Sequence, residues 1–84
     1  MKRVRDFTIE TAHALFDLRI FVAEDGENYV GQYTGTTPKS MLKGIEGGKQ
    51  TDQSLDRLIA TCRREIEKID GKILDTTERK SLVS

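Results

Sequence analysis

The sequence has few of the residue types that usually identify a chemical activity. Its 84 residues include one cysteine, one histidine, one proline and no tryptophan. A single cysteine excludes an intrachain disulfide and fits a reducing compartment. A metal site needs three or four ligands, and His13 has no second histidine or nearby cysteine to join it. We therefore expect no metal site, no cofactor and no enzymatic activity, because no pair of groups offers a nucleophile with its base.

The sequence also lacks a long hydrophobic run. Its longest apolar stretch, residues 14–23, is interrupted by Asp17 and Arg19, whereas a membrane-spanning helix needs about 20 apolar residues. The basic N-terminus is not followed by an apolar stretch of signal-peptide length. These absences predict a cytoplasmic protein with no membrane partner.

A net charge is absent as well, because 14 basic residues balance 14 acidic ones. General polyanion binders usually carry a clear basic excess, so the balance argues against one. Hydrophobic residues make up 36% of the chain, which predicts a thin core that gains from burial against a partner or a second copy. The length suits one domain, which we place at residues 1–74, followed by a flexible C-terminal tail at residues 75–84.

The clearest pattern that is present is a β-hairpin. Apolar residues alternate with other side chains over residues 16–22, which is typical of a half-buried strand. Asp25-Gly26 suits a two-residue type I′ turn. A hairpin centred there pairs Leu18 with Tyr33 on the core face and Phe21 with Val30 on the other face. The returning strand, residues 29–34, is expected at an edge of the sheet.

An earlier strand is expected at residues 4–10. A reversal around Ala12-His13 places Asp6 opposite Arg19, an opposite-charge pair. Ala-His is poor chemistry for a two-residue turn, so a loop of about four residues is expected there.

An amphipathic helix is predicted from Asp52 to Asp70. Its apolar stripe falls within one 100° arc and consists of Leu55, Leu58, Ile59, Cys62, Ile66 and Ile69. Thr51 or Asp52 can cap its start and Gly71 its end, and Cys62 is expected to be a small core residue. The sequence thus predicts an α+β fold, a small antiparallel β-meander of about three strands packed under one long C-terminal amphipathic helix.

The segment before this helix is rich in glycine. Thr37-Pro38 looks like the start of a short helical turn through Met41, Leu42 and Ile45. Backbone N–H groups near the helix start can hold an anion or a phosphate. The candidate anion-binding residues are Gly47, Gly48, Lys49 and Thr51.

Two surface features are candidate partner-binding sites. Phe21 and Val30 form an apolar pair on the sheet face opposite the predicted core. On the outer face of the helix, three basic side chains lie within about 40° of each other at 100° per residue, and these are Arg57, Arg64 and Lys68.

Three functions stay open at this point. The first is a non-catalytic interaction or regulatory protein, such as an accessory protein or a phage-type inhibitor, which binds another protein or itself as a homodimer. The second is nucleic-acid binding through the basic helix face. The third is binding of a small phosphorylated ligand by the glycine-rich segment at residues 44–51.

Overall fold

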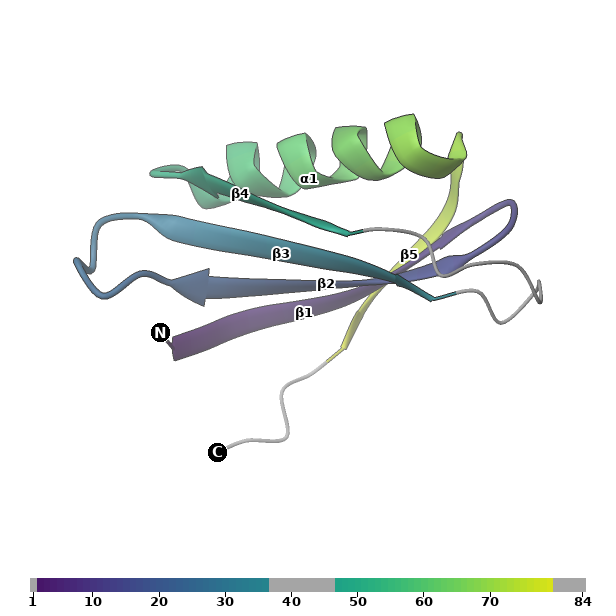
Figure 1. Ribbon diagram of the computed structural model, residues 1–84. Helices are drawn as coiled ribbons and strands as arrows, with labels where there is room; N and C mark the ends of the chain where they lie inside the picture. Colours follow the sequence, from purple (N-terminus) through teal and green to yellow (C-terminus); the bar gives the residue numbers. More distant parts are fainter. Residues whose placement is uncertain (1, 37–46, 80–84) are drawn as a thin grey trace.

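The protein is an α+β structure in which one helix lies across one face of an antiparallel sheet (Figure 1). The computed structural model describes residues 2–36 and 47–79. In chain order the elements are β1 (Lys2–Thr11), β2 (Leu15–Val22), β3 (Tyr29–Thr36), β4 (Gly48–Asp52), α1 (Leu55–Asp70) and β5 (Ile73–Arg79). The sheet has five strands in the order β4-β3-β2-β1-β5, and all neighbouring strands are antiparallel.

The α+β class and the antiparallel sheet are confirmed, but the number of strands and the position of the helix were predicted wrongly. The sheet has five strands instead of about three, and β5 follows the helix. Both additional strands are edge strands, and their sequences, GKQTD and ILDTTER, lack apolar alternation. The expected edge position of residues 29–34 was also wrong, because β4 pairs with β3 along its outer side.

The predicted register of the first three strands is confirmed. Leu18 faces Tyr33 and Phe21 faces Val30 across β2 and β3. Asp6 faces Arg19 across β1 and β2. The helix-facing side chains of these strands form the core together with Leu58, Cys62 and Ile66 of α1.

The loop between β2 and β3 is longer than the predicted two-residue turn. The Ala23 N–H donates to the Asn28 carbonyl at 2.9 Å, and the Gly26 N–H donates to the Ala23 carbonyl at 3.0 Å. Within this loop only Gly26 has a positive φ, 74°, so Asp25 does not adopt the type I′ conformation. Its carboxylate instead accepts from the N–H groups of Glu27 and Asn28. The register survives because the longer loop is centred on the same two residues.

The helix begins later than predicted and ends where predicted. Ser54 caps its start, since its hydroxyl accepts from the Arg57 N–H, and Asp52 lies in β4 instead of at the cap. Gly71 follows the last turn with a φ of 81°, and its N–H donates to the Glu67 carbonyl at 2.7 Å. Of the predicted apolar stripe, Ile69 is 40% exposed and lies outside the core.

Beyond the helix, the chain returns to pair with its first strand. Residues 75–79, expected in a flexible tail, belong to β5, where Arg79 pairs with Asp6 and Thr77 with Thr8. A bidentate ion pair links β1 to β5. In it the Arg5 Nε donates to the Glu78 Oε2 at 2.7 Å and the Arg5 Nη2 donates to the Glu78 Oε1 at 2.6 Å. The domain therefore extends past residue 74, because the backbone of this segment is paired in the sheet.

Two sequence predictions fall outside the described residues. They are the short helical turn after Thr37-Pro38 and the end of the predicted tail, residues 80–84. Within residues 2–36 and 47–79, no helix is both long and apolar enough to cross a bilayer.

Candidate functional site

No described element covers the sheet face that points away from α1, which we call the open face (Figure 1). Cross-strand partners project to the same face, so the register places the side chains of the open face in four rows. The first row is Arg3, Phe21, Val30 and Thr51. The second is Arg79, Asp6, Arg19, Gln32 and Lys49. The third is Thr77, Thr8, Asp17 and Thr34, and the fourth is Asp75, Glu10 and Leu15.

The apolar pair predicted for this face lies in the first row. Phe21 and Val30 face each other across β2 and β3, and Val30 does not belong to the main core cluster. Val30 is only 8% exposed, while Phe21 is half-buried. The apolar area of the open face is therefore small, and the half-buried Phe21 and Leu15 supply its accessible part.

Charges on the open face are segregated along the strands. The first two rows carry four basic residues and one acidic residue, a net charge of +3. The last two rows carry three acidic residues and no basic residue, a net charge of −3. One end of the face thus carries a positive excess and the other a negative one, and an ion pair between the Arg79 Nη2 and the Asp17 Oδ1, at 3.3 Å, joins the two halves.

Asp6 lies at the centre of the positive half and is 7% exposed. Its Oδ2 is 3.3 Å from the Arg3 Nε, and Arg19 and Arg79 are its register partners on the two neighbouring strands. Its Oδ1 is buried with no hydrogen-bond partner among the described residues. A buried polar atom without a partner costs about 1–3 kcal/mol, so residues 2–36 and 47–79 do not fully satisfy the polar groups of this face.

The predicted basic row on the helix is exposed but partly neutralised. Arg57 forms an ion pair with Asp52, with its Nε 2.8 Å from Oδ2 and its Nη2 2.9 Å from Oδ1. Hydrogen bonds from Arg57 and from the Ser54 N–H lower the pKa of Asp52 to about 2. Lys68 is 3.0 Å from a Glu65 carboxylate oxygen. Arg64 beside them has no ion pair within residues 2–36 and 47–79, so it is the main available cation of this row.

The glycines proposed to bind an anion do not lie at the helix start. Gly48 pairs with Tyr33 as the first residue of β4, and a β-carbon on Gly48 would lie 2.6 Å from the Tyr33 hydroxyl. A β-carbon on Gly47 would overlap the Tyr33 carbonyl oxygen. These two glycines therefore allow the edge strand to approach Tyr33 closely. Lys49 and Thr51 are exposed residues of the open face.

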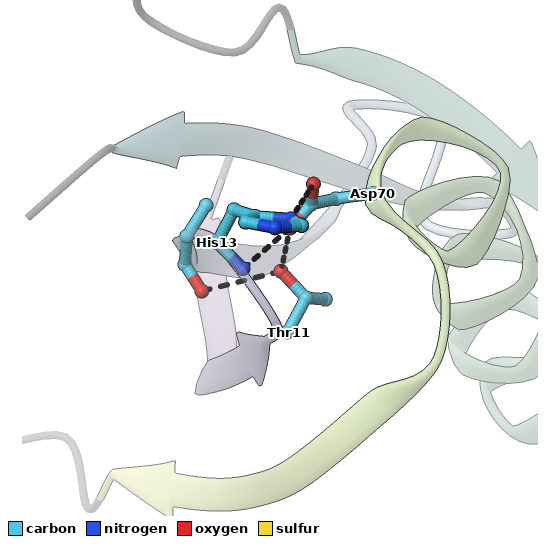
Figure 2. Close-up of polar contacts among 4 residues, drawn as sticks. Thr11, His13 and Asp70 are labelled. Carbon is cyan, nitrogen blue, oxygen red and sulfur yellow. Dashed lines mark hydrogen bonds and ion pairs between the residues drawn. The ribbon is translucent and has the colours of Figure 1, made fainter. Parts of the chain in front are cut away.

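The only histidine lies in a polar cluster that joins the β1–β2 turn to the end of α1 (Figure 2). The Asp70 Oδ2 accepts from the Thr11 hydroxyl at 2.5 Å and from the His13 N–H at 3.0 Å. The other oxygen is 3.2 Å from the His13 Nδ1. Hydrogen bonding, above all from Thr11, holds the pKa of Asp70 below its usual range.

This cluster has the residue types of a catalytic triad but not the geometry of one. Thr11 is fully buried and its hydroxyl also lies 3.2 Å from the Ala14 carbonyl. Asp70 contacts both other members, so Thr11 is not aligned with a histidine base. The cluster instead fixes the short turn over Ala12-His13, where the Thr11 N–H donates to the Ala14 carbonyl at 3.0 Å. Three residues, 12–14, separate β1 from β2, close to the expected loop of about four, and Asp70 supplies the contacts that Ala-His lacks.

Cys62 is fully buried, in agreement with its predicted role in the core. Burial, with a smaller contribution from Glu65, raises the pKa of its thiol to about 11. Reactive thiols need the opposite environment. Among the residues that the structure describes, no group of three or more histidine, cysteine, aspartate or glutamate side chains is arranged to hold a metal ion.

The sequence-based site residues covered only part of the open face. Phe21 and Val30 were found because the predicted hairpin paired them. The register also contained the Asp6–Arg19 pair, which was a signal for the charged rows. Arg79 and Asp75 were missed because residues 75–84 had been predicted to form a flexible tail.

We compared the chain with protein-family models, with curated proteins and with solved structures, and none of them matched.

Proposed function

We propose that the protein is a non-catalytic interaction protein that binds another protein through the open face of its sheet. The observation behind this proposal is the combination of the half-buried Phe21 with segregated charges on one face. Interfaces combine aromatic anchors with polar groups that need partners. A role as an accessory or inhibitory protein fits this surface, since such proteins act by occupying a partner.

Nucleic-acid binding through the helix has less support. Two of the three residues of its basic row, Arg57 and Lys68, form ion pairs with carboxylates of the same chain. An internal carboxylate competes with a phosphate for the same cation, which reduces the counterion release that drives nucleic-acid binding. Binding of a phosphorylated ligand also has less support. It was predicted because Gly47 and Gly48 were expected at the helix start, but the strand β4 lies between Gly47 and the helix.

The test is native mass spectrometry of the tagged protein purified from its own host. Three proteins are compared: the wild type, Phe21→Glu and the triple variant Arg57→Ala/Arg64→Ala/Lys68→Ala. A bound protein that is lost with Phe21→Glu and retained with the triple variant supports the open face.

The same experiment contains the opposing outcomes. A nucleic acid or protein that is lost only with the triple variant would assign binding to the helix. Recovery of all three proteins without any bound macromolecule, including a second copy, would contradict the proposal.

A further inference from the structure

The charge pattern of the open face is self-complementary. Its positive rows and its negative rows are equal in magnitude and lie at opposite ends of the same strands. A face with these properties matches a second copy of itself when the two copies run in opposite directions. We propose that the partner of the open face is a second copy of this chain, docked sheet against sheet around a two-fold axis perpendicular to the strands.

The position of the axis follows from the register. The axis runs between the two packed sheets, parallel to their planes and perpendicular to the strands. When it passes over the Phe7–Leu18 pair, it lies between the second and third rows. It places each strand over the same strand of the partner, in the opposite direction. Arg19 then lies over the partner's Asp17, and Arg3 lies over the partner's Glu10. Each of these opposite-charge pairs occurs twice in the symmetric dimer.

The same axis also matches the apolar residues. Phe21 in the first row is placed over the partner's Leu15 in the fourth row. Phe21 and Leu15 are both partly buried in the single chain. Packed sheets lie about 10 Å apart, a distance that an arginine and an aspartate, or a phenylalanine and a leucine, can span together. Charge and apolar contacts therefore select the same arrangement.

The alternative two-fold arrangement is unfavourable. An axis parallel to the strands would place each row over the same row of the partner. The two +3 ends would then face each other, as would the two −3 ends, and like charges in contact oppose association. The segregation of charge along the strands thus specifies the direction of docking as well as the face.

The interface is small. Rows one to four extend over about 24 Å of strand, and five strands at their normal spacing are about 19 Å wide. This area lies at the low end for specific interfaces, so we expect a dissociation constant of about 1 µM or weaker. The proposal rests on the open face being the binding surface, as proposed above.

A charge-swap experiment tests this arrangement. Arg19→Asp would place two carboxylates opposite each other in the homodimer, and Asp17→Arg would place two guanidinium groups opposite each other. Each variant alone should self-associate at least tenfold more weakly than the wild type in sedimentation velocity experiments. An equimolar mixture of the two should form a 1:1 heterodimer, because each introduced charge then faces its opposite.

Controls separate docking from folding. Arg64→Asp makes the same change in charge on the helix and should associate like the wild type. Circular dichroism and thermal melting establish that each variant is folded. If either charge reversal does not fold, Arg19→Gln and Asp17→Asn remove the attraction without adding repulsion and should each weaken association two- to fivefold.

Three results would overturn the proposal. They are a wild type that remains monomeric at about 1 mM, association of both charge reversals at wild-type strength, and a mixture of folded variants that stays monomeric. A monomeric wild type that still captures a different host protein through Phe21 would refute self-docking and leave the proposed function in place. Loss of both would refute the two together.

Discussion

Gly31 of β3 lies so close to Cys62 of α1 that a β-carbon on Gly31 would stand 2.6 Å from the Cys62 Sγ. Both residues are buried, and the Leu58 side chain lies 3.4 Å from the same position. Because atoms do not approach this closely without a shift of one element, this contact sets the distance between the helix and the sheet.

Gly31→Ala should lower the free energy of unfolding by about 1–3 kcal/mol, as expected for overpacking in a core. Urea denaturation of the variant measures the effect. Cys62→Ala removes the sulfur that the new methyl group would meet, so the double variant should be more stable than the sum of the single effects predicts. Additive effects would show that the two residues are not in contact. Gln32→Ala, at an exposed neighbour on β3, is the matched control and should change stability by less than about 0.5 kcal/mol.

The Cys62 thiol should react slowly with thiol reagents in native buffer and fast in denaturant. The thiol is fully buried and burial raises its pKa, so little reactive thiolate is accessible in the folded protein. The rate of labelling by a chromogenic disulfide, with and without urea, measures this difference. Fast labelling of the folded protein would contradict the core position of Cys62.

The pairing of the first three strands could be predicted because it depends on local patterns. The alternation over residues 16–22 and the loop centred on Asp25-Gly26 determine which residues face each other, even though the loop conformation was predicted wrongly. The edge strands could not be predicted in the same way. β4 is held by backbone pairing and by close approach to Tyr33 through Gly48, and neither leaves an apolar period in the sequence.

The open face could likewise be predicted only in part from local sequence patterns. Its Phe21–Val30 pair was contained in the hairpin register, whereas the charge segregation depends on residues of β5 and β4 that come together only in the complete sheet. The turn at Ala12-His13 is a further case. Its conformation depends on Asp70, which is 57 residues away from His13 in the sequence.

Asp70→Ala should destabilise the protein by about 1–3 kcal/mol, because it removes charge-assisted hydrogen bonds to a buried hydroxyl and a backbone N–H. Asp70→Asn keeps an oxygen that can accept from Thr11 and should cost less. Chemical denaturation of the three proteins at pH 7 gives the order of stability. Equal stability of Asp70→Ala and the wild type would show that the cluster does not hold the turn.

Acid should weaken the fold between about pH 4 and pH 2, in part through Asp52. Its pKa is about 2 in the folded protein, against 3.8 as the ordinary value, so the unfolded state binds the proton more readily. The stabilisation is present above about pH 4 and is lost as the pH falls through 2. Asp52→Asn should lower stability at pH 7 and flatten the pH dependence in this range.

Denaturation curves recorded from pH 2 to pH 7 measure this effect. Glu24→Gln, at an exposed carboxylate in the β2–β3 loop, provides the control and should leave the shape of the pH dependence unchanged. A pH dependence of Asp52→Asn identical to that of the wild type would contradict the role of the Arg57 ion pair.

The pairing of β5 with β1 has a consequence during protein synthesis. β1 is synthesised before β5, the strand that pairs with its outer edge. β5 ends at Arg79, 68 residues after β1 ends at Thr11. At about 5–20 residues per second, the ribosome needs roughly 3 to 14 seconds to complete that partner. During this time the nascent chain exposes an unpaired strand edge, which can pair with other chains. Lys2, Arg3 and Arg5 lie at the start of this strand, where their charges discourage aggregation until the last strand leaves the ribosome and completes the sheet.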